Sequence, residues 1–174
     1  SARKNFRNEI YPEYKGNRSD APDDLIPQFD YIRKSVLAFN LPSIELINYE
    51  ADDLIATYVD QILSKGAKVT IVSSDKDLMQ LYKKNVRIYD PMKNKFINKE
   101  DVNNKFGVKP ESVIDVQALA GDSTDNVPGV PGIGVKTAAE LINEYGTLEN
   151  LLKNAQKIKQ NKRRLTLLEN QLNS

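Results

Sequence analysis

Hydrophobic positions recur along the chain with two different spacings. Over residues 1–100, stretches with helical spacing alternate with short β-branched or alternating runs. The predicted helices are Leu25–Phe39, Tyr49–Lys65 and Asp77–Tyr82. The predicted strands are Ser43–Ile47, Lys68–Ser73 (typical of a buried strand), Val86–Tyr89 and Lys95–Ile97. Such alternation indicates an α/β fold, with a parallel sheet and flanking helices.

The strand pattern ends near Ile97, and helical spacing dominates the rest of the chain. The predicted helices there are Asp101–Phe106, Pro110–Ala120, Gly134–Tyr145 and Thr147–Asn154. A basic run, Lys157–Arg164, precedes a polar helical tail. We therefore expect two parts: an α/β core over residues 1–100, with a basic segment at 1–30, and a helical module over residues 101–174.

Composition narrows the chemistry. The 174 residues are 40% apolar and 28% charged with a net charge of +1, as in a soluble globular protein, and no apolar run reaches membrane-spanning length. The absence of cysteine excludes disulfides and thiolate metal sites, and fits a cytoplasmic location. Because histidine is absent too, any hydrolysis must use carboxylates, lysine or metal-bound water.

Three acidic groups stand at the ends of predicted elements. They are Glu50 with Asp52 and Asp53, Asp75 with Asp77, and Asp122 with Asp125. In an open parallel sheet, ligands bind outside the carboxyl ends of the strands, where Asp75 and Asp77 are expected. Each group also has a structural explanation, because acidic residues favour the first turn of a helix, cap helices and occur in polar loops.

If the three groups converge, their mutual repulsion favours a metal site. Two carboxylates about 4 Å apart repel by about 4 kcal/mol at an effective dielectric constant near 20. Several such pairs would exceed the stability of a typical domain unless cations or protons neutralise them. Ligation by oxygen alone selects Mg²⁺ or Mn²⁺. Two such ions would clamp the attacking and leaving oxygens of a phosphodiester.

Two further segments are suited to binding phosphate. The hairpin Val127–Gly134 opens a helix that carries Lys136 and Thr137, so backbone amides can approach a DNA phosphate without reading bases. A simple turn between two helices is the alternative. The basic segment interleaves aromatic residues with cations, which favours base stacking and phosphate contact over a solvated helix face. Its residues are Phe6, Arg7, Tyr11, Tyr14, Lys15 and Arg18.

Five motifs occur in an order that resembles the 5′-nuclease domain of bacterial DNA polymerase I, itself similar to phage 5′-exonucleases and flap endonucleases. The motifs are Phe6-Arg7 with Tyr14-Lys15-Gly16-Asn17-Arg18, Tyr49-Glu50-Ala51-Asp52-Asp53, Ser74-Asp75-Lys76-Asp77-Leu78, Gly121-Asp122 with Asp125-Asn126, and Gly129-Val130 with Gly132-Ile133-Gly134-Val135-Lys136-Thr137-Ala138. The resemblance covers nearly the whole chain. It implies a PIN-like α/β core and a helix-three-turn-helix module of the helix-hairpin-helix type.

The resemblance also implies roles for individual residues. The metal ligands, direct or through water, would be Glu50, Asp52, Asp53, Asp75, Asp77, Asp122 and Asp125. Arg7, Lys15 and Arg18 would grip the scissile phosphate in a helical gateway. The DNA-binding residues would be Tyr14, Gly129, Gly132, Ile133, Gly134, Lys136 and Thr137, with a monovalent cation such as K⁺ at the hairpin. The family begins with a strand that carries a metal-binding aspartate, and this strand is absent from the sequence.

These features together predict a structure-selective 5′-3′ exonuclease and flap endonuclease. It would use two Mg²⁺ or Mn²⁺ ions to cut 5′ flaps and nicked or branched duplexes, without sequence preference, in primer removal and repair. We expect a monomer without a membrane partner, in the bacterial cytoplasm near the nucleoid. The sequence does not say whether a polymerase domain follows. Because the first strand is missing, a module that binds branched DNA without cutting it is the main alternative. A Mg²⁺-dependent phosphatase is a third, and it would not need the hairpin.

Overall fold

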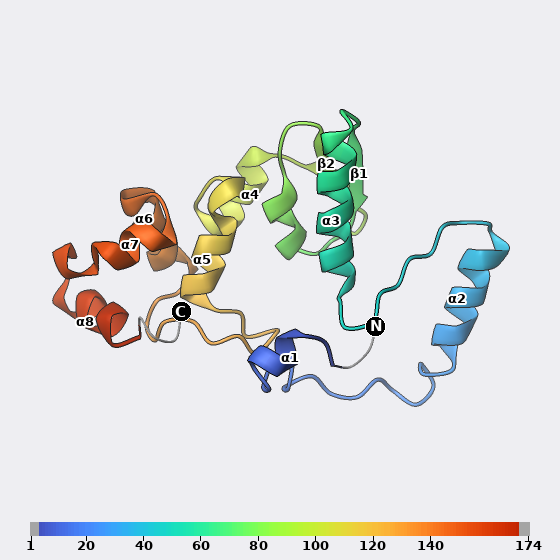
Figure 1. Cartoon of the computed structure of the whole chain (residues 1–174), viewed down its shortest axis with the longest axis horizontal. Coiled ribbons are helices and arrows are strands. Elements are labelled where there is room, and N and C mark those ends of the chain that lie inside the picture. The colour runs from blue at the N-terminus through green and yellow to red at the C-terminus, as the bar shows by residue number, and fades with distance from the viewer. Residues whose placement is uncertain (1–3, 171–174) are drawn as a thin grey trace. The chain divides into compact units, whose positions relative to one another are not determined.

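The computed structural model describes residues 4–170. They form two compact units, and each is described by itself. Unit 1 comprises Ser1–Leu54 and Thr124–Asn126, and unit 2 comprises Ile55–Ser123 and Val127–Ser174. The first residues of the predicted basic segment and the last residues of the predicted tail lie outside the described residues. Figure 1 follows the chain from α1 to α8.

Unit 1 consists mainly of turns and extended segments. Its helices are α1 (Arg7–Ile10), α2 (Gln28–Ala38) and the first turn of α3 (Ala51–Ser64). The predicted helix at Leu25–Phe39 is confirmed, but its regular part begins only after Pro27, which stands at the N-cap. Proline suits the start of a helix because it has no backbone N–H to satisfy there. Neither α1 nor α2 contains a buried residue.

The predicted strand at Ser43–Ile47 is wrong. This segment is an extended loop, and Ile44, Leu46 and Ile47 are all exposed, Ile47 by 83%. An alternating pattern forms a strand only where a second backbone accepts its hydrogen bonds. The sheet in the described part of the chain consists of β1, β2 and β3, and this segment is not one of its strands.

The sheet belongs to unit 2 and has the order β1–β2–β3. Strand β1 (Val69–Val72) pairs in parallel with β2 (Val86–Asp90), so that Ile71 lies opposite Ile88. Strand β3 (Lys95–Ile97) pairs antiparallel with β2. The strands predicted at Lys68–Ser73, Val86–Tyr89 and Lys95–Ile97 are confirmed. The predicted parallel pairing holds for β1 with β2 but not for β3. The expectation of a buried first strand is wrong for one face of β1. Side chains alternate between the two faces of a strand, so Ile71 is buried whereas its neighbour Val72 is 64% exposed.

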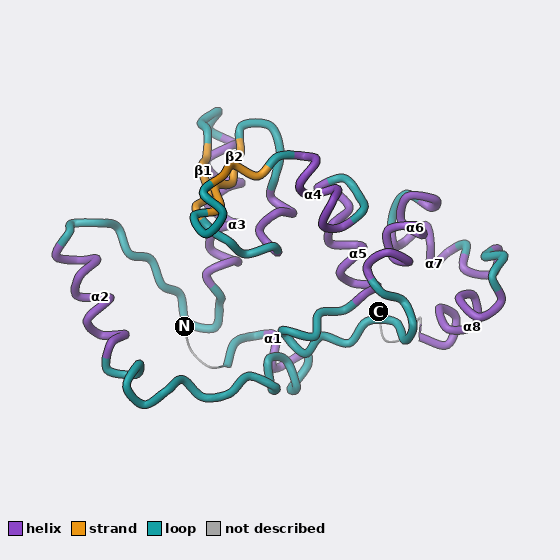
Figure 2. Tube along the Cα trace, turned by 180° about the vertical axis from the view of Figure 1, so that it is seen from behind, coloured by secondary structure: helices purple, strands orange, loops and turns teal. Residues whose placement is uncertain are grey.

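Short helices complete unit 2. The 3₁₀ helix η1 (Asp77–Leu81) connects β1 to β2, as the short helix predicted there. The helical part contains α4 (Lys99–Phe106), η2 (Pro110–Ser112), α5 (Val113–Ala120), α6 (Val135–Tyr145), α7 (Leu148–Lys153), η3 (Ala155–Lys157) and α8 (Asn161–Asn170). Figure 2 shows that strands occur only before α4 among the residues it describes.

Local sequence explains where these helices begin and end. A capping box of Asn98 and Asp101 starts α4, and Gly107, at a φ of +72°, ends it. The helices enclose an apolar core to which Val102, Val116 and Ile142 contribute fully buried side chains. This core fixes α5 and α6 against each other. The loop between these two helices carries two of the predicted acidic residues, Asp122 and Asp125, and the glycine hairpin.

Candidate active site

In unit 1, Arg7 and Asp53 form a bidentate ion pair. The two guanidinium nitrogens lie 2.9 and 2.7 Å from the two carboxylate oxygens. Asp53 Oδ2 also accepts a hydrogen bond from the backbone N–H of Glu50, so the carboxylate caps the first turn of α3. The hydrogen bond from Arg7 holds the pKa of Asp53 below its usual value. The guanidinium also lies over the Phe6 ring, 4.6 Å from its centroid.

Lys15 joins two further carboxylates of unit 1. Its Nζ lies 2.7 Å from Glu50 Oε2 and 3.5 Å from Asp125 Oδ2. The hydroxyl of Tyr14 is within 3.3 Å of the same two carboxylates. Arg18 donates to the other oxygen of Asp125 at 2.5 Å. Burial alone would lower the pKa of Lys15, but hydrogen bonds with Glu50 and Tyr14 outweigh it and raise that pKa.

The three predicted phosphate-gripping cations are therefore paired with three of the predicted metal ligands. This arrangement relieves the repulsion between carboxylates that a metal was expected to relieve. Among residues 4–170, no three acidic side chains gather into a metal-binding group. Asp52 lies in the first turn of α3 and is partly buried. Asn5 was not predicted, and its amide donates to Glu50 Oε1 at 2.5 Å.

Unit 2 holds the second acidic set around Lys76. The ammonium of Lys76 hydrogen-bonds to Asp122 Oδ2 and lies 3.7 Å from Asp77 Oδ1. Gln117 of α5 donates its side-chain amide to Asp77, and Asp75 accepts the backbone N–H of Asp77 at 2.9 Å. Burial raises the pKa of Asp77. As in unit 1, one lysine lies between two predicted metal ligands.

Asp90, at the end of β2, is 2% exposed and was not predicted as a site residue. Its Oδ1 accepts the hydroxyl of Ser74 at 2.6 Å and the backbone N–H groups of Met92 and Lys93. Lys93 Nζ lies 3.0 Å from Oδ2. These contacts, the Ser74 hydrogen bond first, lower the pKa of Asp90 to about 2. A buried carboxylate thus anchors the residue that directly precedes Asp75.

Two glycines let the backbone cross itself beside Asp122. A Cβ on Gly121 would lie 2.3 Å from the backbone nitrogen of Gly129, and a Cβ on Gly129 would lie 2.3 Å from the carbonyl carbon of Ala120. The Asp122–Val127 β-bridge closes the acidic loop at the same point. Backbone crowding therefore requires glycine at both positions.

The end of the hairpin is open. Gly134 is the N-cap of α6, no side chain caps this end, and a Cβ on Gly134 would have no atom within 4 Å. Gly132 has a φ of +77°, which favours glycine. Ile133 is buried, whereas Lys136 is exposed and Thr137 partly buried. An uncapped helix start next to a lysine can accept an anion.

The structure thus brings the predicted cations of unit 1 together with Glu50, Asp53 and Asp125, and gathers Asp75, Asp77 and Asp122 around Lys76 in unit 2. That these two sets and the hairpin form one site remains a prediction. Sequence reasoning missed Asn5, Lys76, Asp90 and Gln117. Lys76 did have a signal, because a cation between two aspartates is placed to neutralise them. Asn5 and Gln117 contact carboxylates that are distant in the sequence, and no local pattern marks them. The turn at Met92 and Lys93 explains Asp90 locally, but its bond to Ser74 could not be read from the sequence.

Comparison with known proteins identifies the family to which the small α/β part and the helical module belong. Residues 1–107 match the 5′-3′ exonuclease N-terminal resolvase-like domain, and residues 108–173 match the 5′-3′ exonuclease C-terminal SAM fold. The chain belongs to the 5′-3′ exonuclease family. The predicted family and fold class are confirmed.

Similar proteins belong to the same family. The chain is 60% identical over 167 residues to a DNA polymerase I of Rhizobium leguminosarum, covering 96% of this chain and 16% of that protein. It is 46% identical over 154 residues to a 5′-3′ exonuclease of Aquifex aeolicus, covering 88% of this chain and 53% of that protein. The chain thus spans about half of this exonuclease relative and a smaller part of the polymerase.

A solved structure extends the comparison. A bacteriophage T5 flap endonuclease in a pseudo-enzyme-product complex with DNA and metal ions superposes with a TM-score of 0.81 at 26% identity. The match covers 96% of this chain and 66% of that one. No helix within residues 4–170 is long and apolar enough to cross a membrane.

Proposed function

We propose that the protein is a metal-dependent 5′-3′ exonuclease and flap endonuclease that hydrolyses DNA phosphodiesters. One observation carries the proposal: in each unit, a lysine ammonium lies between two carboxylates that the family motif assigns to metal binding. A pair of carboxylates that shares one cation can also share a divalent ion. The T5 relative whose structure contains DNA and metal ions supports this reaction class.

The residues present fit Mg²⁺ or Mn²⁺. In unit 1 the ligands would be Glu50, Asp52, Asp53 and Asp125, and in unit 2 they would be Asp75, Asp77 and Asp122. All of their donor atoms are carboxylate oxygens, which hard divalent cations prefer. Two such ions, when bound, supply an activated water and charge neutralisation at the phosphodiester.

Arg7, Lys15 and Arg18 would hold the scissile phosphate. In the structure they are engaged with Asp53, Glu50 and Asp125. If those carboxylates held divalent cations instead, the ammonium of Lys15 and the guanidinium of Arg18 would be available for phosphate oxygens. There they would stabilise the negative charge that develops during hydrolysis.

The glycine hairpin would hold the duplex backbone. The turn of the hairpin is formed by Gly129, Gly132, Ile133 and Gly134. The start of α6, with Lys136 and Thr137, would contact a DNA phosphate, and a K⁺ ion would bind at the hairpin. Tyr14 would stack on a base once its hydroxyl leaves Glu50 and Asp125. Contacts of this kind carry no sequence information, so selection would rest on 5′ flaps, nicks and branches.

The cellular setting is proposed from the relatives. Because the chain is 60% identical to part of a DNA polymerase I, we propose that it acts beside a polymerase domain in primer removal and repair. In this role it would act as a monomer in the bacterial cytoplasm, near the nucleoid.

A second function is favoured by a specific observation. Within the described residues, the acidic side chains pair with lysine and arginine instead of gathering around a common point. A module with this arrangement would bind branched DNA without cutting it.

A labelled 5′-flap duplex, incubated with the protein in Mg²⁺ or in EDTA, separates these functions. Cleavage only in Mg²⁺ supports the nuclease. A gel shift without cleavage in either condition supports the binding module and contradicts the nuclease. Mg²⁺-dependent hydrolysis of small phosphate esters without DNA binding would contradict both and favour a phosphatase.

A further inference from the structure

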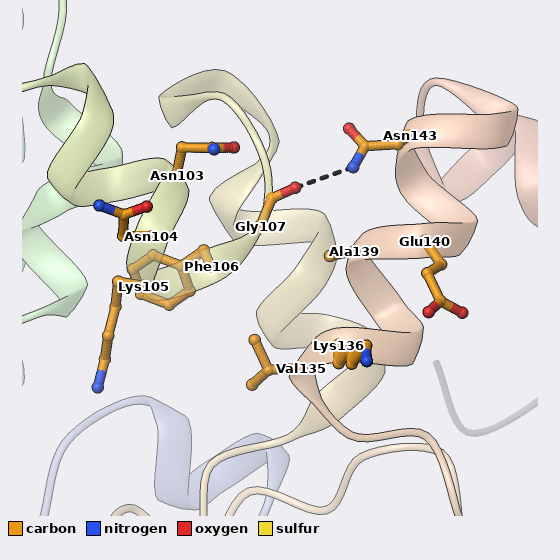
Figure 3. Close-up of a pocket in the computed structure, with 10 residues that line it drawn as sticks. All are labelled: Asn103, Asn104, Lys105, Phe106, Gly107, Val135, Lys136, Ala139, Glu140 and Asn143. Carbon is orange, nitrogen blue, oxygen red and sulfur yellow. Dashed lines mark hydrogen bonds between the residues drawn. The ribbon is translucent and has the colours of Figure 1, made fainter.

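A cavity of about 470 Å³ lies in unit 2, between the C-terminal turn of α4 and the N-terminal half of α6. Figure 3 shows its lining residues as sticks. The hairpin motif accounts only for the α6 wall. Nothing in the reaction proposed above uses the α4 wall, which consists of Asn103, Asn104, Lys105, Phe106 and Gly107.

The two walls are fixed to each other. A Cβ on Gly107 would lie 2.8 Å from the Cβ of Ala139, so only glycine lets α4 end this close to α6. The side-chain amide of Asn143 donates to the carbonyl oxygen of Gly107 at 2.9 Å, across the same junction (Figure 3). The cavity is therefore formed before any ligand arrives, which reduces the entropic cost of binding.

The lining is apolar at the bottom and polar at the rim. Phe106 and Ala139 are 3% and 5% exposed and form the floor, whereas Val135 is 41% exposed. Asn103 and Asn104 present exposed side chains from the last two turns of α4. Such a lining suits a ligand that presents a C–H face to the floor and charged or polar groups to the rim.

The rim carries a net positive charge. Lys105 on α4 and Lys136 on α6 are exposed, and among the described residues neither forms an ion pair, in contrast to Lys15, Lys76 and Lys95. Glu140, the one acidic residue of the lining, is neutralised by Arg163, whose NH1 lies 3.1 Å from its carboxylate. Two cations without counter-ions face the solvent beside an apolar floor.

We propose that this cavity binds the sugar-phosphate backbone of DNA, with Lys105 and Lys136 on phosphates and Val135 against a deoxyribose. The two lysines come from different helices and are seen on either side of Val135 in Figure 3. This inference rests on the proposed function, because DNA is the polyanion that the family motif supplies. It extends the DNA-binding surface from the hairpin to the end of α4.

The test compares Lys105→Ala with Lys99→Ala in the full chain. Lys99 is exposed, stands at the start of the same helix and does not line the cavity, so it is a matched control. Binding of a fluorescent 5′-flap duplex is followed by anisotropy in EDTA, over a series of salt concentrations. The association constant K falls as salt rises, and losing one phosphate contact should make the slope of log K against log salt less steep by about 0.9. Binding should weaken about five- to tenfold near 0.1 M salt.

Lys105→Arg, which keeps the charge, should bind nearly as well as the unsubstituted protein. The same effect of Lys105→Ala and Lys99→Ala would overturn the cavity proposal alone. If the unsubstituted protein does not bind the duplex at all, both the cavity proposal and the proposed function are contradicted. Thermal unfolding of each variant checks that the exposed substitution leaves the fold intact.

Discussion

The ammonium of Lys76 hydrogen-bonds to the carboxylate of Asp122, which lies 46 residues further along the chain. The same ammonium faces Asp77, at 3.7 Å. Lys15 stands in a similar relation to Glu50 and Asp125 in unit 1. Each unit therefore contains a lysine that neutralises two predicted metal ligands, and a divalent ion must compete with that lysine.

Replacing Lys76 by methionine should therefore strengthen divalent-ion binding. We expect the affinity for Mn²⁺, measured by isothermal titration calorimetry, to rise about three- to tenfold as the competing charge is removed. Lys83→Met is the control, because Lys83 pairs with the exposed Asp60. Unchanged or weaker Mn²⁺ binding in the Lys76 variant would contradict the competition.

Arg7→Lys should loosen unit 1 although the charge is kept. Lysine cannot form both hydrogen bonds to Asp53 or lie flat over Phe6, so we expect a loss of about 1–2 kcal/mol. The backbone N–H of Phe6 donates to the carbonyl oxygen of Asn48. Its hydrogen exchange should therefore be faster in the Arg7 variant than in the unsubstituted protein, and the ratio of the two rates measures the loss. Arg33→Lys, at an exposed pair with Glu45, should leave stability nearly unchanged, because solvent screens exposed ion pairs. Equal effects of the two substitutions would contradict the role of the bidentate pair.

Stability should fall in acid because of Asp90. The pKa of Asp90 is lowered from 3.8 to about 2 in the folded protein, so its contribution is present above about pH 4 and is lost as the pH falls towards 2. Urea unfolding at pH 6 and pH 3 measures this loss. Asp90→Asn should be less stable at pH 6 and show a smaller drop between the two pH values. A drop as large as in the unsubstituted protein would show that other groups cause it.

Substitutions of the hairpin glycines should have two kinds of effect, one on stability and one on DNA binding. Gly129→Ala places a methyl group 2.3 Å from the backbone of Ala120, and we expect a cost of about 2–4 kcal/mol in urea unfolding. Gly134→Ala meets no atom within 4 Å, so its stability should change by less than about 1 kcal/mol. Its binding of 5′-flap DNA should still weaken, because the methyl group lies where a phosphate would approach α6. A stable Gly129 variant, or normal DNA binding by the Gly134 variant, would contradict this division.

The elements that local pattern determines were predictable from the sequence. The spacing of apolar residues predicts α3, α5 and α6, and the β-branched runs predict β1 and β2. The same pattern failed at Ser43–Ile47 and at Val72, because neither the partner of a strand nor what covers its faces is encoded in the strand itself. For the site, motif order predicts which acidic residues and cations take part, but not which cation pairs with which carboxylate. The Lys76–Asp122 pair and the support of Ser74 by Asp90 depend on how distant segments fold together.

The central claim is that the carboxylates beside Lys76 and Lys15 bind the metal ions that cut DNA. Asp75→Ala tests it most directly, because Asp75 is exposed and its loss should leave the fold intact. The measurement follows cleavage of a labelled 5′-flap duplex in Mg²⁺ together with binding of the same duplex in EDTA, with Asp60→Ala as control. We predict that the Asp75 variant binds the flap normally and does not cut it, whereas the control does both. Normal cutting by Asp75→Ala would contradict the account.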